Sequence, residues 1–223
     1  MSNINGVDMI RKHFIWLNEQ NTTPGTNLEI DDALFTADQD VIFGTINDDY
    51  LNREMEWYKS QSRKVSDMSD PVPEIWQNMV DDKGMVNSNY GWCVFSEENG
   101  NQYNSCRNEL LMNRDSRRAT MIYQRPSMHV DATANGMNDF ICTNCAHVLI
   151  RDNNLIYTVN MRSSDAIYGY KYDLKWHEYV YEKLFQDLVQ TYPVLTYHNL
   201  LWFAHLLHIY AKHRYLIDES AQA

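Results

Sequence analysis

Apolar side chains recur every three or four positions in four stretches of the chain, a spacing that predicts four amphipathic helices. These stretches cover residues 7–18, 48–61, 97–113 and 174–190. Asn47 stands directly before the second stretch and can cap its first turn. Glu54 interrupts the apolar face of that helix, an unusual place for a carboxylate. We expect the first helix to pack against a sheet.

Shorter runs of apolar and aromatic residues predict strands. They cover residues 33–43, 90–95, 120–124 and 138–152. Cys142 falls inside the last of these runs, and the Asn153-Asn154 pair that follows predicts a turn. A second strand then leads to Arg162 and Ser163, so the sequence predicts a β-hairpin with a thiol at one end and a cation at the other.

Length and charge limit the possible functions of the chain. Its 223 residues suffice for one substantial core, and we expect a single domain over residues 1–223. The net charge of −11 argues against a nucleic-acid surface, which needs a basic stripe. Neither a secretory leader nor a membrane-length apolar run is evident, so we expect a cytoplasmic protein with no membrane contact. In that setting its four cysteines are expected to be reduced.

Two patterns suggest metal binding but fit it poorly. Cys142 and Cys145 form a C-x-x-C motif, yet in an extended strand these two side chains would point to opposite faces. His205 and His208 are three residues apart, but no carboxylate completes a ligand set in the pattern. We therefore expect no metal. Taken alone, Cys142 suits either a small core residue or a nucleophile.

Other candidate residues also have ordinary structural interpretations. Arg117 and Arg118 form an adjacent basic pair, which is commonly solvated, since neighbouring side chains diverge. Asp173 precedes an amphipathic stretch and could be the N-cap of its helix. Glu54 could be a half-exposed helix residue.

Several short motifs nevertheless occur together between about Val41 and Asp218. They are Asp115–Arg118, Cys142, Asn160–Asp165, Gly169, Asp173 and His208–Tyr210. Together they resemble the thymidylate synthase superfamily. Segments 54–59, 87–92 and 123–128 are similar to the phage deoxycytidylate (dCMP) hydroxymethylases within it. The resemblance implies an α+β fold, in which helices pack on a mixed β-sheet and one sheet face lies at a homodimer interface.

The resemblance also implies roles for the residues that would act on the base. Cys142 would attack C6 of the pyrimidine, which makes C5 nucleophilic. Glu54 would organise water and proton transfer, and Tyr90 would lie near the C5 proton. Asp173 replaces the asparagine of the enzymes that act on uracil. Its carboxylate can accept hydrogen bonds from the cytosine N4 amino group and from a protonated N3.

Further residues would hold the rest of the nucleotide and the folate. By resemblance, Arg117 and Arg118 reach the nucleotide phosphate of the other subunit, beside that subunit's own Arg162 and Ser163. The deoxyribose 3′-hydroxyl would be bound by His208 and Tyr210. The residues that match positions holding the cofactor, 5,10-methylenetetrahydrofolate, are Trp76, Asp165 and Gly169. Asp165 could instead be a structural hydrogen-bonding residue.

The implied reaction is transfer of a one-carbon unit to C5 of dCMP, followed by water addition to give 5-hydroxymethyl-dCMP. Three alternatives remain open: methylation of dCMP with hydride from the folate, methylation of dUMP, and binding of a nucleotide without catalysis. Asp173 argues against dUMP, and the presence of both arginine sites with Cys142 argues against an inactive relative. By resemblance, the methylating members end in a tail that closes over the folate, and we expect the chain end at Asp218–Ala223 to fall short of such a closure, which favours hydration.

Overall fold

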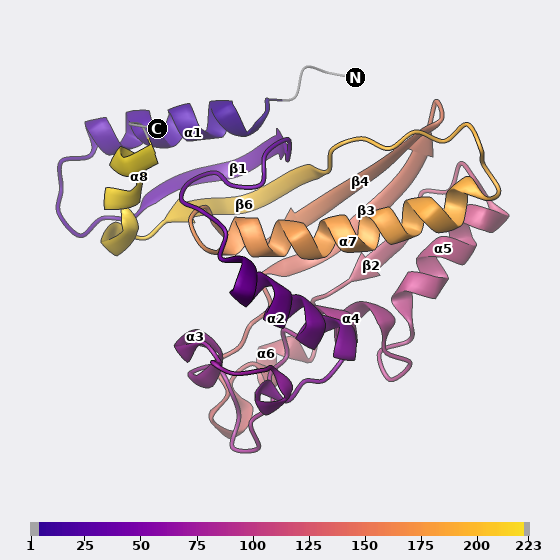
Figure 1. Ribbon diagram of the computed structural model, residues 1–223, viewed down its shortest axis with the longest axis horizontal. Helices are drawn as coiled ribbons and strands as arrows, with labels where there is room; N and C mark the ends of the chain where they lie inside the picture. Colours follow the sequence, from indigo (N-terminus) through magenta and orange to yellow (C-terminus); the bar gives the residue numbers. More distant parts are fainter. Residues whose placement is uncertain (1–4, 221–223) are drawn as a thin grey trace. The chain divides into compact units, whose positions relative to one another are not determined.

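The computed structural model describes residues 5–220, which form two compact units (Figure 1). The first unit is drawn from Met1–Ile46 and His147–Ala223, and the second is Asn47–Ala146. The expectation of a single catalytic domain stays a prediction. Residues 221–223, which belong to the chain end used above to favour hydration, lie outside the described part.

The first unit is organised around strand β6 (Leu201–Ile209). β6 pairs antiparallel with β1 (Leu28–Thr36) and parallel with both β4 (Asn154–Met161) and β5 (Ser164–Asp165). Strand β3 (Thr143–Arg151) enters this unit from the second one and lies next to β4 in the strand order. The sheet is therefore mixed, as predicted.

Helices of the first unit cover this sheet with apolar side chains. α1 (Val7–Gln20) runs alongside β1 and buries Val7, Ile10 and Phe14, as its periodicity predicts. α7 (Gly169–Val189) packs on β4 and β5 and buries a row of large residues. That row is Leu174, Trp176, Val180, Tyr181, Leu184 and Leu188. The 3₁₀ turn η3 (Ala211–His213) and α8 (Tyr215–Ser220) follow β6.

The β3–β4 hairpin turns at Asp152 and Asn153, which have φ angles of 49° and 62°. Two consecutive positive φ angles are typical of a type I′ turn, which matches the twist of the strands it joins. The turn lies one residue earlier than the Asn153-Asn154 pair predicted. Arg162 directly follows β4, as expected, and so the hairpin delivers this cation to the end of its second strand.

The second unit contains mainly short helices. α2 (Asp48–Ser60) begins after Asn47, whose side chain accepts a hydrogen bond from the Tyr50 backbone amide, so the predicted cap is confirmed. The elements that follow are η1 (Val65–Asp67), α3 (Glu74–Gln77), α4 (Tyr90–Phe95), α5 (Gln102–Met112), β2 (Thr120–Ile122), α6 (Met128–Asp131) and η2 (Ala134–Gly136).

Close packing of α4 on α2 explains one wrong prediction. Residues 90–95 were expected to be a strand because they are aromatic and β-branched, but they form α4. The Asn89 side chain caps this helix at the Trp92 amide. A Cβ on Gly91 would lie 1.6 Å from the Tyr58 carbonyl oxygen, so the contact requires glycine. Tertiary packing here overrides local strand propensity.

Other boundaries also differ from expectation: α5 begins at Gln102 rather than at residue 97, and β1 ends at Thr36 rather than at residue 43. Cys142 lies at a bend directly before β3, not inside the strand. α7 begins at Gly169, five residues earlier than predicted, and β1 begins at Leu28, also five residues earlier. Lys171 and Asp173 obscure the start of α7, whereas in β1 the adjacent Asp31-Asp32 pair interrupts the alternation, at a residue, Asp32, with a φ of 47°.

Candidate active site

Glu54 is a buried carboxylate in the second unit, not a half-exposed helix residue. It lies on α2 with 4% of its surface exposed. Its Oε1 accepts a hydrogen bond from the Tyr50 hydroxyl and one from Trp76 Nε1 at 3.3 Å. Trp76 Nε1 also lies 3.1 Å from the Tyr50 hydroxyl oxygen, so these three side chains form one polar cluster in an apolar setting.

Burial gives Glu54 the electrostatics of an acid–base group. Loss of solvent raises the pKa of this carboxyl to about 7, although hydrogen bonds from Tyr50, Trp76 and Tyr58 act in the opposite direction. A carboxyl that titrates near neutral pH can both accept and donate a proton under physiological conditions. This is the property that the predicted role demands.

Tyr90 is connected to this cluster through Tyr58. The two tyrosine rings stack with centroids 5.2 Å apart and an interplanar angle of 17°. The Tyr90 hydroxyl accepts a hydrogen bond from Thr143 Oγ1 at 3.0 Å. Since Thr143 follows Cys142 in the chain, a continuous path of contacts leads from Glu54 to the residue beside the thiol.

Cys142 itself is half-buried, and none of the four cysteines, all of which lie in the described part, forms a disulfide. Cys93 and Cys106 are buried, and burial raises the pKa of both thiols to about 12. Burial also raises the pKa of Cys145. The accessible position of Cys142 suits a nucleophile better than the sites of Cys93 and Cys106.

The two adjacent arginines lie on the surface of the second unit. Arg117 is exposed, and the Arg118 side chain is 80% exposed. Arg118 is nevertheless paired with Glu109, with Nη2 3.1 Å from Oε1. Both arginines are accessible to another molecule, and Arg118 would have to exchange Glu109 for a phosphate.

The first unit gathers a second set of predicted residues around β5 and β6. Ser163 Oγ lies 3.3 Å from Nδ1 of His208, and Asp165 pairs with His208 in the strand register. Burial lowers the pKa of His208, and Arg162 lowers it further, whereas Asp165 acts to raise it. The His208 and Tyr210 rings meet edge to face at 4.7 Å. A neutral histidine can accept or donate a hydrogen bond, as binding of a sugar hydroxyl requires.

Asp165 ends β5, and Gly169 and Asp173 lie in the first turns of α7 in the same unit. Asp165 Oδ1 accepts from the backbone amides of Ile167 at 2.8 Å and Tyr168 at 3.3 Å, so a structural role is present. A Cβ on Gly169 would lie 3.3 Å from Asp165 Cβ and 3.7 Å from Asp173 Oδ2. Asp173 is four residues beyond the first residue of α7. The alternative that it caps this helix is therefore wrong.

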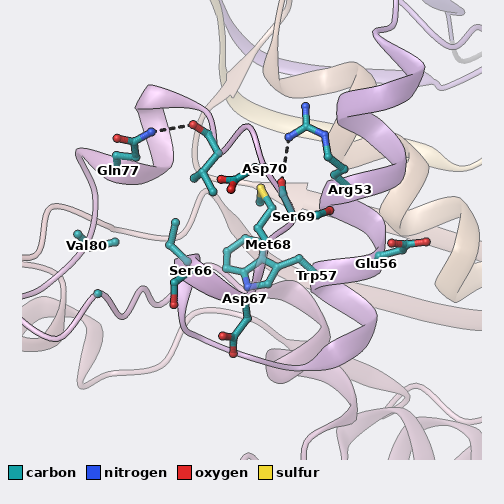
Figure 2. Close-up of a pocket in the computed structure, with 13 residues that line it drawn as sticks. Arg53, Glu56, Trp57, Ser66, Asp67, Met68, Ser69, Asp70, Gln77 and Val80 are labelled. Atoms are coloured by element: carbon teal, nitrogen blue, oxygen red, sulfur yellow. Dashed lines mark hydrogen bonds between the residues drawn. The ribbon is translucent and has the colours of Figure 1, made fainter.

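A separate pocket of about 860 Å³ opens in the second unit (Figure 2). Arg53, Glu56 and Trp57 of α2 contribute to it, together with the loop that contains Met68 and Asp70. None of the residues predicted to act in catalysis is among those that line it. Its polar wall is largely satisfied internally, for example by Arg53, which donates to the carbonyl of Ser69.

Within residues 5–220, no three His, Cys, Asp or Glu side chains are grouped so as to hold a metal ion. His205 and His208 lie on the strand β6, and His205 Nδ1 is 3.0 Å from Asp32 Oδ1. No helix in the described part of the chain is both long and apolar enough to cross a membrane.

Two residues of the site were not predicted from the sequence: Tyr50 of the polar cluster, and Thr143, which donates to Tyr90. Tyr50 stands four residues before Glu54, a spacing that places both on one helix face and could have indicated their contact. Thr143 gave no such signal, because its partner Tyr90 is 53 residues away in the sequence.

The sequence of the chain matches a known enzyme family over most of its length. Residues 46–222 match the family model described as thymidylate synthase, so the chain belongs to the thymidylate synthase family. The thermostable thymidylate synthase A from Bacillus subtilis shares the fold with a TM-score of 0.65. The two chains are 17% identical in sequence, and the similarity covers 92% of this chain and 73% of that one.

Within the family, the chain is similar to enzymes from two phages. This chain is 47% identical over 193 residues to proteins named deoxycytidylate 5-hydroxymethyltransferase from Enterobacteria phages T6 and T4. Each alignment covers 86% of this chain and 78% of the relative. The resemblance to the phage hydroxymethylases within the thymidylate synthase superfamily is confirmed.

Proposed function

We propose that this chain is a deoxycytidylate 5-hydroxymethyltransferase that acts as a homodimer with one catalytic domain per subunit. It would convert dCMP, 5,10-methylenetetrahydrofolate and water into 5-hydroxymethyl-dCMP and tetrahydrofolate. The observation that carries the proposal is the 47% identity to phage enzymes of that name. The phage origin of these relatives also supports action in the cytoplasm of an infected bacterium.

Cys142 is the proposed nucleophile. Its thiolate adds to C6 of cytosine, and the electron pair of the C5–C6 double bond becomes available at C5 for a new carbon–carbon bond. The C5 proton then leaves, tetrahydrofolate departs from the one-carbon unit as the leaving group, and the Cys142–C6 bond breaks when water adds to that unit. The half-buried position of Cys142 at the bend before β3 supports this role.

Glu54 and Tyr90 are the proposed proton-transfer residues. The pKa of Glu54, raised to about 7 by burial, allows it to exchange protons with water at neutral pH. Tyr90 lies beside Tyr58, whose hydroxyl interacts with Glu54. In this proposal the cluster removes the C5 proton and orients the water that adds last.

Asp173 is the proposed reader of the base. Its carboxylate offers acceptors to the N4 amino group and to a protonated N3, and its negative charge favours that protonation. The position of Asp173 inside α7 supports this role, because a helix N-cap function would have explained the carboxylate more simply.

The phosphate would be bound by four residues from two subunits. Arg162 and Ser163 act in their own subunit, and Arg117 and Arg118 reach the phosphate of the partner subunit. The exposure of Arg117 and Arg118 supports a contact with a second molecule. His208 and Tyr210 would bind the 3′-hydroxyl, and the contact between Ser163 and His208 supports a joint role for the phosphate and sugar sites.

Trp76, Asp165 and Gly169 would hold the folate, which supplies a one-carbon unit at the oxidation level of formaldehyde when it is bound. The Asp165 carboxylate can accept from the N–H groups of a reduced pterin, and Trp76, which is 8% exposed, would contribute an apolar side of the site. A Cβ at position 169 would lie 3.3 Å from Asp165 Cβ, so the glycine leaves space beside that side chain.

The decisive experiment is mass spectrometry of the nucleotide product after incubation with dCMP and 5,10-methylenetetrahydrofolate. We expect a mass increase that corresponds to a hydroxymethyl group, and none with Cys142→Ala. A methyl product would indicate hydride transfer from the folate. No product from the folded wild-type protein would contradict the proposed function.

A further inference from the structure

Asp139 is a buried carboxylate that none of the proposed catalytic steps uses. It is 2% exposed and lies in the second unit. Its Oδ2 accepts from the backbone amides of Asn87 at 2.6 Å and Ser88 at 2.7 Å, and its Oδ1 accepts from the Ser88 hydroxyl. Three donors therefore converge on one side chain, which is the arrangement that stabilises a carboxylate away from water.

The contact of Asp139 with residues 87 and 88 lies close in the sequence to the proposed reacting groups, Cys142 and Tyr90. Asp139 precedes Cys142 by three residues, and Asn87 and Ser88 directly precede the segment that carries Tyr90. On the other side of the thiol, Thr143 donates to the Tyr90 hydroxyl. Cys142 is thus bracketed by two hydrogen-bonded tethers, at positions 139 and 143, that both end on residues 87–90.

A second layer of side chains fixes the same segment. Asn87 Nδ2 donates to the Asp139 carbonyl at 3.1 Å. Asn87 Oδ1 accepts from Arg63 at 2.9 Å and from Arg125 at 2.8 Å. Both guanidinium groups also lie over the Trp92 ring, with centroid distances of 4.9 and 5.3 Å. These partners hold Asn87 in place, and with it the backbone amide that Asp139 binds.

Burial of this charged network costs more free energy than burial of apolar side chains in the same place would. Burial raises the pKa of Asp139, which means that removal from water disfavours its charged form. Apolar residues of similar volume often replace buried charges without loss of stability. A directional polar contact is useful where the orientation of a segment matters, and these contacts lie next to both Cys142 and Tyr90.

We propose that Asp139 is a positioning residue that holds the Cys142 segment in register with the Tyr90 segment. The inference rests on the proposed function, because it gives Cys142 and Tyr90 their reactive roles. Small errors in the position of reacting groups have large effects on rate, with about 1 Å costing up to about a hundredfold. Asp139 should therefore affect turnover without touching the substrate.

The test compares Asp139→Ala, Asp139→Asn and Ser88→Ala in a Cys145→Ala background. Asparagine keeps the oxygen that accepts from the two amides, and its NH₂ can donate to the Ser88 hydroxyl, so it is the conservative variant. Ser62→Ala is the matched control, since Ser62 donates to the exposed Asp67 at 2.6 Å in the same unit. The readouts are tritium release from [5-³H]dCMP with folate and the rate of Cys142 alkylation by iodoacetamide without substrate.

We expect Asp139→Ala to lower kcat about tenfold or more with little change in the Kd for dCMP. Asp139→Asn should recover most of the rate. Because a loosened segment exposes the thiol, Cys142 alkylation should accelerate in Asp139→Ala while buried Cys106 stays protected. If Asp139→Ala does not fold, the comparison of Ser88→Ala with Ser62→Ala tests the inference instead. Only Ser88→Ala should then show slower turnover and faster Cys142 alkylation.

Two results would overturn the inference. One is a folded Asp139→Ala protein whose turnover and Cys142 alkylation rate equal those of the wild type. If Asp139→Ala does not fold, the same result for Ser88→Ala would overturn the inference. The other is equal acceleration of Cys106 and Cys142 alkylation, which would indicate general destabilisation. Absence of tritium release from the wild-type protein would instead contradict the proposed function, and the alkylation comparison would still test the tether.

Discussion

Tyr50 and Glu54 lie one turn apart on α2, and the Tyr50 hydroxyl donates a hydrogen bond to the buried Glu54 carboxylate. The pair combines a desolvated acid with a donor that partly stabilises its charged form. Burial is the larger effect, because the pKa of Glu54 is raised to about 7 from its usual value of 4.5. We therefore expect the contribution of Glu54 to stability to change as the pH passes through neutrality.

Glu54→Gln should change the dependence of stability on pH. In the wild type, the folded state holds a proton on Glu54 that the unfolded state has lost between pH 4.5 and about 7. The contribution of Glu54 to the free energy of unfolding is therefore fully present below pH 4.5 and is lost as pH rises through 7. A shift of one pKa unit corresponds to about 1.4 kcal/mol. Between pH 4.5 and pH 8, the free energy of unfolding of Glu54→Gln should therefore rise by up to about 3 kcal/mol relative to that of the wild type.

Urea unfolding at these two pH values measures the difference between variant and wild type. Glu56→Gln is the matched control, because Glu56 is exposed on the same helix, and it should follow the wild type at both values. An equal effect of Glu54→Gln at both pH values would show that Glu54 is not desolvated as the structure indicates. Turnover of dCMP by Glu54→Gln should also fall by about 10²-fold or more, since a general acid–base group contributes that much.

Gly91→Ala should disrupt the second unit more than an ordinary glycine substitution does. The added Cβ would lie 1.6 Å from the Tyr58 carbonyl oxygen, so α4 must move away from α2. Gly25→Ala is the control, because Gly25 has a φ of 80° but no atom within 4 Å of the new Cβ. We expect about 1–2 kcal/mol for the control, from left-handed backbone strain alone, and a larger loss for Gly91→Ala. Equal losses in thermal or urea unfolding would contradict the close approach of the two helices.

The sequence predicted the helices whose apolar residues recur at the regular helical spacing. α2, with its Asn47 cap, and the buried row from Trp176 to Leu188 follow the helical period closely. Residues 90–95 were assigned wrongly, because their helix depends on Gly91 meeting Tyr58, a contact made only in the folded chain. The same limit applies to Asp139, whose partners are about fifty residues away in the sequence.

Cys142→Ser should abolish turnover and leave nucleotide binding within a modest factor, because an alcohol at neutral pH provides almost no alkoxide. Cys145→Ala should remain active, since that thiol has no proposed role. Tritium release and equilibrium binding of dCMP measure the two effects. An active Cys142→Ser protein paired with an inactive Cys145→Ala protein would mean that the nucleophile has been assigned to the wrong residue.

Arg117→Ala and Cys142→Ala should each be inactive, yet they should complement each other after subunit exchange. A mixed dimer would contain one site with an intact Cys142 and an intact Arg117 from the partner. The exposed position of Arg117 is compatible with such a contact. Activity is measured after mixing under conditions in which labelled subunits are shown to exchange. Continued inactivity after demonstrated exchange would count against a phosphate site shared between subunits.

Asp173→Asn should shift the preference of the enzyme from dCMP toward dUMP. The substitution replaces one carboxylate oxygen with NH₂, so a pair of acceptors becomes a donor and an acceptor. With dCMP, the new NH₂ would face the N4 amino group, or the flipped amide would donate to neutral N3 and the activating protonation would be lost. With dUMP, the amide can accept from N3–H and donate to O4.

The size of the shift follows from the unpaired donor, which costs about 1–3 kcal/mol when buried, with a further loss from the missing charge. At about 1.4 kcal/mol per factor of ten, relative kcat/KM should change by about tenfold to several hundredfold. The measurement is kcat/KM for both nucleotides in wild type and variant, at saturating 5,10-methylenetetrahydrofolate. Thermal unfolding of wild type and variant is the control that the variant is folded. A change of less than about threefold, below the range expected from the unpaired donor, would mean that Asp173 does not read the base, and the argument for cytosine over uracil would then fail.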